Sequence, residues 1–365
     1  MRRYLALPLL AAASLTAAVA QPASGDPSLY AGAAREPVRV SAMGLYQQVE
    51  TGIGGSLSQW STPVMAAVPI VPGVALGLRA SYAGAQGDGR TSVSGPADVQ
   101  LALSAIRPVG PASAVASLSV NLPSGERSFS LEEAQTAFLI GQGFYAFGLP
   151  SFGQGLGVTP GLTVALPVGE RLAVGAGVAY QVRGAFQPRS SSPDEYNPAD
   201  ELLLTTGVDT RLSPTATLAF DATASLYGSD TYGALTYATG NALALTTRLD
   251  TQLGPHEARV VGRVAFRGDT EVPPGVAVGT SATVNRQGRV MGRVRFRLTP
   301  RLHLGTLAQV RTYAASEAFA PRTLVDLRLS PEVALGDGLS LVGRAGATLG
   351  SHSGFEAGAG VSWEL

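Results

Sequence analysis

The sequence of 365 residues contains neither cysteine nor lysine. Without cysteine the chain can form no disulfide framework and no thiolate metal site, and it has no cysteine for lipid attachment. All 26 basic residues are arginines, and 26 acidic residues bring the net charge to zero. Charged residues make up only 14% of the chain, which is low for a soluble domain, while 45% are hydrophobic, which argues against a disordered chain.

A helix that crosses a membrane needs about 18 or more consecutive apolar residues. Beyond the N-terminus the sequence has no apolar run of that length. The chain begins with Met1, Arg2 and Arg3, continues with an apolar run over 4–19 and reaches a small-x-small cleavage site at Ala20. This order is typical of an export signal. We therefore expect a signal peptide at 1–20, a periplasmic N-terminal segment at 21–36 and one folded unit at 37–365. If that unit enters a membrane, it must do so as strands.

Arginine and apolar residues alternate strictly near residue 290. Within 289–298, four arginines occupy one parity, whereas Val290, Val294 and Phe296 occupy the other. Side chains alternate between faces in a strand, but a helix would spread these arginines around its circumference. The stretch 259–267 follows the same pattern. Both are predicted to be strands with one charged and one apolar face, although a water-soluble sandwich would also fit the alternation.

Connection lengths separate these two interpretations. Seven short turns containing proline or glycine alternate with longer polar connections such as 123–155, 187–199 and 269–285. Short turns on one side and long loops on the other are typical of outer-membrane barrels. The sequence therefore predicts an all-β protein, a transmembrane antiparallel up-and-down β-barrel of about sixteen strands, with fourteen as the alternative. The predicted location is the cell outer membrane, with leucine-rich faces toward lipid.

The opposite, polar faces are predicted to line the lumen. An arginine facing lipid at mid-bilayer would cost about 2 to 4 kcal/mol, so a strand with four arginines cannot be inverted. Two interpretations remain open: the arginines attract anionic solutes, or they pair across strands and fill the barrel interior. The candidate lumen-lining residues are Arg248, Arg259, Arg263, Arg267, Arg289, Arg293, Arg295, Arg297, Arg311, Asp209, Asp221 and Asp250.

The connection 123–155 has a pattern of its own. Ser130 and Glu133 fit a capping box ahead of a run compatible with a helix, so a short helix is expected in this extracellular loop. A stretch rich in glycine and aromatic residues follows. It is expected either to fold inward as a constriction or to cover the rim as an apolar lid. The candidate constriction or lid residues are Glu132, Glu133, Phe138, Phe144, Tyr145, Phe147 and Phe152.

Three short motifs resemble a known family of outer-membrane channels. Gly95-Pro96-Ala97-Asp98-Val99 enters a strand, the stretch 119–125 closes a hairpin as SVNLPSG, and 161–168 follows. This layout is similar to that of the channel-like proteins grouped with phenol meta-pathway barrels, themselves distantly similar to long-chain fatty-acid channels. The resemblance covers roughly residues 56–185. It implies passage of small hydrophobic molecules through a monomeric barrel.

These patterns predict a barrel for passive passage of small hydrophobic or anionic solutes. The alternative is a non-conducting structural or adhesion barrel. An outer-membrane hydrolase is less well supported, because His256, His303 and His352 have no serine or carboxylate constellation nearby in sequence. The expected partners are outer-membrane lipid, the barrel-assembly machinery and a solute. No cofactor, metal or nucleic acid is expected, and the apolar alternation ending at Trp363 and Leu365 resembles a barrel assembly signal.

Overall fold

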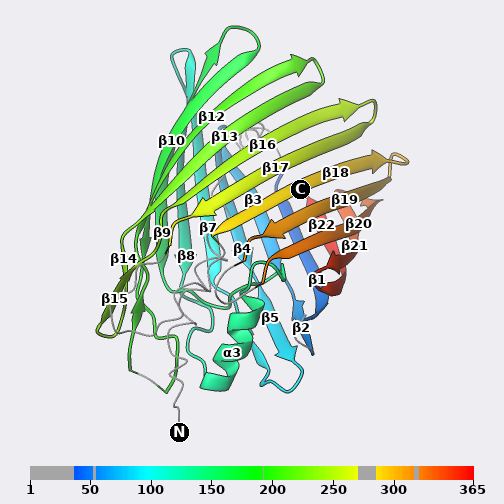
Figure 1. Cartoon of the computed structure of the whole chain (residues 1–365). Coiled ribbons are helices and arrows are strands. Elements are labelled where there is room, and N and C mark those ends of the chain that lie inside the picture. Colours follow the sequence, from blue (N-terminus) through cyan, green and yellow to red (C-terminus); the bar gives the residue numbers. More distant parts are fainter. Residues whose placement is uncertain (1–36, 52–54, 192, 270–284, 316–319) are drawn as a thin grey trace.

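The computed structural model describes residues 37–51, 55–191, 193–269, 285–315 and 320–365 (Figure 1). The expected signal peptide at 1–20 and the segment 21–36 lie outside these described residues. Among the described residues, no helix has the length and apolar character that crossing a membrane requires.

Sixteen wall positions form one antiparallel sheet. Thirteen of them are single strands, and three are each divided into two segments: β2 with β3, β4 with β5, and β6 with β7. The wall strands are β1 (Arg39–Glu50), β2 (Ser56–Ser61), β3 (Val64–Val71), β4 (Val74–Ala80), β5 (Tyr82–Gly87), β6 (Val93–Pro96), β7 (Val99–Val109), β8 (Ala112–Leu122), β9 (Gly157–Val168), β10 (Leu172–Arg183), β12 (Glu201–Ser213), β13 (Ala216–Tyr227), β16 (Ala242–Leu253), β17 (His256–Arg267), β18 (Arg286–Arg297), β19 (Leu302–Tyr313), β20 (Arg322–Gly336), β21 (Leu339–Gly350) and β22 (Ser353–Glu364).

The sheet closes on itself between its first and last strands. β1 pairs with β22 over its whole length, from Arg39 opposite Glu364 to Glu50 opposite Ser353. Closure gives each backbone donor and acceptor in the wall a neighbour, so no strand edge is left in lipid. The predicted antiparallel barrel and the count of sixteen strands are therefore confirmed.

The outer face of the barrel is apolar. In β17, Val260 and Val264 are more than 40% exposed, and their cross-strand partners Leu249 and Leu245 belong to the same face. Exposed aromatic pairs lie on the strands as well: Trp60 stacks on Tyr82 with ring centroids 5.5 Å apart. A closed wall whose outer face consists of leucine, valine and aromatic side chains requires lipid around it. The chain is an outer-membrane β-barrel.

Three neighbouring wall positions are interrupted at one level, at 62–63, 81 and 97–98. The sequence pattern predicts continuous strands over 56–70 and 74–83, and each of these is divided in two. Pro63 has no N–H to donate to the ladder, so β2 and β3 separate there. Backbone bonds bridge the interruptions: Thr62 N donates to Tyr82 O at 2.8 Å, and Ala97 N donates to Ser81 O at 2.8 Å. The wall therefore continues across the break with a local change of direction.

The long connections over 123–156 and 184–200 and the hairpin over 228–241 gather at one end of the barrel, toward the bottom of Figure 1. Helix α3 (Leu131–Ile140) lies there, and its capping box is formed as predicted: Ser130 Oγ accepts from Glu133 N, and Glu133 Oε2 accepts from Ser130 N. The same end carries a small sheet of β11 (Tyr196–Asn197), β14 (Ser229–Tyr232) and β15 (Leu235–Ala238), which the sequence did not indicate. The short turns lie at the other end.

Candidate functional site

The connection between β8 and β9 is anchored at its root by one carboxylate. Asp98, just before β7, accepts hydrogen bonds from Gly125 N at 2.8 Å and Gln154 N at 2.7 Å. Asn121 Nδ2 donates to the same carboxylate at 2.7 Å. Because Gly125 and Gln154 stand at opposite ends of the connection, Asp98 holds both ends together. Bonds from backbone N–H groups to a carboxylate are stronger than neutral ones.

Beyond α3, residues 143–152 form what we call the aromatic segment. Its rings are almost fully buried: Phe144 and Phe152 are 2% exposed. They pack with wall residues such as Leu57 and Leu324 in one continuous apolar cluster. Phe144 and Tyr145 meet edge to face, with centroids 4.6 Å apart. The segment is therefore a packed part of the barrel end, and its aromatic rings do not form an exposed apolar surface.

Two buried glutamines bind the backbone of the aromatic segment. Gln59 Oε1 accepts from Leu149 N at 2.9 Å, and Gln59 Nε2 donates to Leu149 O at 2.6 Å. Gln47 Oε1 accepts from Gly148 N at 2.5 Å. Gln47 and Gln59 are cross-strand partners on β1 and β2. Their neighbours Tyr46 and Trp60 are exposed on the outer face, so the segment lies against the inner wall.

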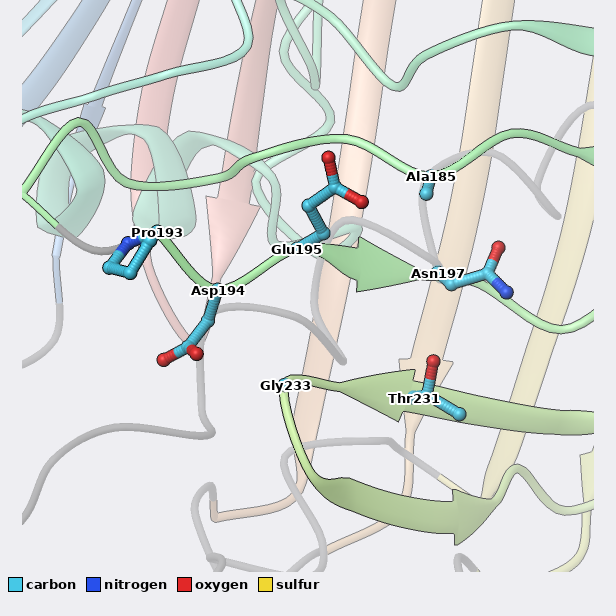
Figure 2. Close-up of a pocket in the computed structure, with 7 residues that line it drawn as sticks. All are labelled: Ala185, Pro193, Asp194, Glu195, Asn197, Thr231 and Gly233. Atoms are coloured by element: carbon cyan, nitrogen blue, oxygen red, sulfur yellow. The ribbon is translucent and has the colours of Figure 1, made fainter.

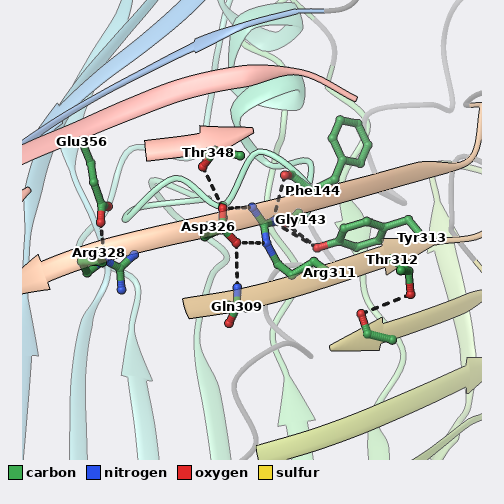
Figure 3. Close-up of polar contacts among 12 residues, drawn as sticks. Gly143, Phe144, Gln309, Arg311, Thr312, Tyr313, Asp326, Arg328, Thr348 and Glu356 are labelled. Carbon is green, nitrogen blue, oxygen red and sulfur yellow. Dashed lines mark hydrogen bonds and ion pairs between the residues drawn. The ribbon is translucent and has the colours of Figure 1, made fainter. Parts of the chain in front are cut away.

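On β19 and β20 an ion pair makes the corresponding contact (Figure 3). Arg311 Nη2 donates to Asp326 Oδ1 at 2.8 Å and Arg311 Nε donates to Asp326 Oδ2 at 2.6 Å, a bidentate pair. Arg311 Nη1 donates to Phe144 O at 2.9 Å. Tyr313 Oη donates to Gly143 O at 3.2 Å. The arginine is only 4% exposed, so its charge interacts with Asp326 and the segment backbone and does not face the lumen. We call the wall residues that contact residues 143–149 the seat of the aromatic segment.

The turn between β21 and β22 adds His352 to this seat. His352 is 5% exposed, and its ring centroid lies 5.1 Å from that of Tyr145 and 6.3 Å from that of Phe144. Arg322, at the start of β20, lies over the Phe144 ring, 4.2 Å from its centroid. Burial and the nearby guanidinium groups of Arg322 and Arg311 lower the pKa of His352 from 6.5 to about 4. The imidazole is therefore neutral at pH 7.

The predicted arginine wall lies on β16, β17 and β18 with the expected parity. Direct cross-strand neighbours share a face, and Arg263 stands opposite Arg289. Arg289 in turn stands opposite Arg311 on β19. Arg259 stands opposite Arg293 and, on its other side, opposite Asp250. Guanidinium groups thus occupy successive positions around the inner surface.

Carboxylates pair with some of these arginines. Asp250 binds Arg259 and, at 2.9 Å, Arg248. Glu332 binds Arg295 at 3.0 Å. Next to them, Glu356 holds both Arg328 and Arg344, the latter at 2.8 Å. Each of these three carboxylates therefore has its charge matched or exceeded by arginine.

A smaller group of arginines has no acidic partner. Among the residues that the structure describes, Arg263, Arg289, Arg293 and Arg297 form no ion pair. We call these four the unpaired arginines. Arg267 contacts the Tyr227 ring, 4.9 Å from its centroid, in place of an acid. The inner surface thus carries a local excess of positive charge.

The wall from β8 to β10 has a different inner surface. Its central inward positions are small and uncharged: the cross-strand register pairs Ser117 with Gly161, Ser119 with Thr159, and Thr163 with Gly177. The charged inward residue of β10 is Arg183 at its end, and it is paired with Glu201. Side chains of this size leave room along the wall. The middle of this part of the wall is therefore neutral, in contrast to the arginine-rich strands β17 and β18.

The remaining sequence-predicted residues are distributed more widely. Asp209 and Asp221 are exposed at inward positions of β12 and β13. Glu132 is exposed on the first turn of α3, and Glu133 is engaged in the helix cap, so neither belongs to the aromatic cluster. Phe138 is half-buried on α3. Phe144, Tyr145, Phe147 and Phe152 come together in the cluster.

Sequence reasoning missed most of the residues that bind the aromatic segment, namely Gln47, Gln59, Asp326, Arg322 and His352. The only signal for Gln47, Gln59, Asp326 and Arg322 was inward parity combined with polarity on strands near the chain ends, and His352, which lies in a turn, had no such signal. Parity assigns a face but does not indicate which loop will cover that face.

A separate pocket of about 510 Å³ lies among the long connections (Figure 2). Asp194, Glu195, Asn197 and Thr231 line it together with Ala185, Pro193 and Gly233. None of these residues belongs to the arginine wall. Among the described residues, no group of histidine, aspartate and glutamate has the arrangement of a metal site.

Neither a protein-family model nor a curated protein sequence matches the chain. Solved structures are similar to it over most of their length. An outer membrane channel from Pseudomonas putida F1 is 10% identical with a TM-score of 0.42, and the match covers 90% of this chain and 96% of that one. An anion-selective porin from Comamonas acidovorans is 8% identical with a TM-score of 0.44, covering 90% and 98%. The outer-membrane expressed OmpT of Vibrio cholerae is 9% identical with a TM-score of 0.44, covering 90% and 97%. The expected likeness to channel-like outer-membrane barrels is confirmed at the level of architecture, which the strand pairings of this chain establish independently.

Proposed function

We propose that this barrel provides passive passage across the outer membrane for small solutes, with a preference for anions over cations. The observation that carries the proposal is the cross-strand pair Arg263 and Arg289, two like charges directly opposite each other without an acidic partner among the described residues. Such a pair destabilises a sheet unless water and anions neutralise it. Rings of arginine favour anions in pores.

The aromatic segment is proposed to be the constriction of this passage. Its residues 144–149 are bound to β1, β2 and β19 through their backbone. Solutes would then pass between the aromatic segment, whose rings are packed against the wall, and the unpaired arginines. The role is transport without catalysis, and the protein is proposed to act as a monomer inserted by the barrel-assembly machinery.

Charge selectivity tests the proposal. In planar bilayers under a KCl gradient, the purified barrel should give a reversal potential closer to the equilibrium potential of chloride than to that of potassium. The double variant Arg263→Gln/Arg289→Gln should lose several-fold in chloride preference. Arg107→Gln removes a charge near the short-turn end of β7, where Arg107 Nη1 donates to Pro72 O, and serves as the control with selectivity kept. Cation preference in the unmodified barrel would contradict the proposal.

The constriction is tested by deleting residues 128–152. The ends that remain are close, because a Cβ on Gly153 would lie 2.5 Å from Arg127 Cγ. Conductance should rise, since the largest inward element is removed. An unchanged conductance would reject the constriction.

A second candidate is a non-conducting structural or adhesion barrel. The packing of the aromatic cluster favours it, because Leu324 and Ile140 are completely buried and Leu57 is 1% exposed. A liposome swelling assay with small anionic, neutral aromatic and cationic solutes distinguishes the two. If no solute causes swelling, either with the unmodified barrel or after deletion of residues 128–152, the structural barrel is the better interpretation.

A further inference from the structure

His352 is a buried polar side chain without a hydrogen-bond partner. Both ring nitrogens, Nδ1 and Nε2, are shielded from solvent and bind no described group. A buried polar group that makes no hydrogen bond has a cost of about 1 to 3 kcal/mol, so its environment is unfavourable even when the ring is neutral. The ring is held there by its contacts with Tyr145 and Phe144 of the aromatic segment.

The charged groups around His352 are mostly cationic. Arg322 faces it from β20 and Arg311 from β19, and both disfavour an additional positive charge. Asp326 acts in the opposite direction, but it is already engaged by Arg311, Gln309 and Thr348. Tyr145 from the segment and Tyr313 from β19 are the neutral titratable groups nearby, and Arg90 adds a further positive charge beside Tyr145. A proton on His352 would add a fourth cation to Arg322, Arg311 and Arg90 around the Phe144 and Tyr145 pair.

We propose that His352 makes the seat of the aromatic segment acid-sensitive: protonation of His352 releases residues 143–149 from β19, β20 and the turn between β21 and β22. Release gives the imidazolium water and separates it from Arg322 and Arg311. The consequence for passage rests on the proposed function, whereas the release itself does not.

The direction follows from proton linkage. Seated, His352 has a pKa of about 4, and released into water it returns to about 6.5. Between these values the released state binds more protons than the seated state. The seat is therefore fully stable above pH 6.5 and weakens as the pH falls toward 4. The equilibrium constant for release should rise by roughly two orders of magnitude between pH 7 and pH 4.

Hydrogen exchange of the whole barrel in detergent or lipid tests the release. Peptides covering 143–152 are followed at pH 7 and pH 4 in the unmodified protein and in His352→Phe, which keeps an aromatic ring and cannot be protonated. The two proteins should be equally protected at pH 7. At pH 4 the unmodified protein should exchange at least tenfold faster than the variant.

His303→Gln is the matched control, because His303 lies on β19 opposite Arg297 and away from the segment. It should behave like the unmodified protein at both values of pH. Both His352→Phe and a second variant, His352→Gln, are checked for the gel mobility of a folded barrel. If His352→Phe does not fold, His352→Gln replaces it in the comparison. Equal loss of protection in His352→Phe, or no loss in the unmodified protein, would overturn the proposal.

Conductance measured over the same range of pH separates the two proposals. A conductance that rises in acid in the unmodified protein but not in His352→Phe supports both the release and the proposed function. Acid-dependent loss of protection without any conductance at either pH leaves the release in place and counts against the proposed function.

Discussion

The carboxylate of Asp98 accepts a hydrogen bond from the backbone N–H of Gly125 at 2.8 Å. The same carboxylate accepts from Gln154 N at 2.7 Å, at the far end of the same connection. A side chain on the wall therefore closes a loop of about thirty residues at its base. The position of the aromatic segment depends on this closure, because the Gln47, Gln59 and Arg311 contacts can form only if the loop leaves the wall at this point and in this direction.

Asp98→Ala should loosen the aromatic segment. It removes the acceptor for Gly125 N, Gln154 N and Asn121 Nδ2, and hydrogen bonds to a charged group contribute about 1.5 to 3 kcal/mol each. Since water replaces part of this, we expect a loss of about 3 kcal/mol in the free energy of opening, measured by hydrogen exchange of 143–152. Asp88→Ala is the control, because Asp88 accepts one bond from Ser56 N in a neighbouring turn. Equal effects of the two variants would argue against the closure.

Gly125→Ala and Gly143→Ala should differ sharply although they lie in one connection. A Cβ on Gly125 would overlap Phe152 O and lie 2.7 Å from Asp98 N, both backbone atoms that cannot move independently. A Cβ on Gly143 would meet nothing within 4 Å. We expect a cost of about 1 to 3 kcal/mol at Gly125 and little change at Gly143. Thermal unfolding followed by gel mobility checks this, and a destabilised Gly143→Ala with an unaffected Gly125→Ala would contradict the packing described.

Val264→Arg and Ala265→Arg test the assignment of the two faces. Val264 is 44% exposed on the outer face of β17, and Ala265, its chain neighbour, faces inward opposite Gln287. An arginine toward lipid costs about 2 kcal/mol or more within the apolar band, whereas the lumen hydrates the charge. Equilibrium unfolding from lipid vesicles should show the loss only for Val264→Arg. A larger loss for Ala265→Arg would reverse the orientation of the wall.

Much of the wall could be read from the residues because a strand repeats every two positions. Parity assigned Arg289 and Arg293 to one face and Val290 to the other; Val290 is exposed on the outer face, and a register shift by one residue would turn several arginines toward lipid. The helix cap at Ser130 was equally local, since a capping box needs only four consecutive residues. The interruption of the wall at Pro63 also has a local cause, but the sequence pattern did not predict it. A proline can end a strand or lie at its edge, and only the neighbouring strand decides which occurs.

Contacts between distant residues had no comparable signal. Gln47 binds Gly148 across 101 positions, and His352 meets Tyr145 across more than two hundred. The sequence left the aromatic segment open as a constriction or a rim lid, because composition indicates that rings must be covered and does not indicate by what. The same holds for the arginines: parity placed Arg263 and Arg311 on one face, and only the approach of Phe144 O and Asp326 buried the second.

The sequence by itself determined that this chain is a β-barrel with a lipid-facing apolar surface and a polar interior, because the alternation of side chains is a local property of each strand. The tertiary structure alone decided which arginines are matched by carboxylates, and which wall residues hold the aromatic segment. Those outcomes depend on closure of the barrel, which brings the first and last strands together and places β1, β2, β19 and β20 around a single loop.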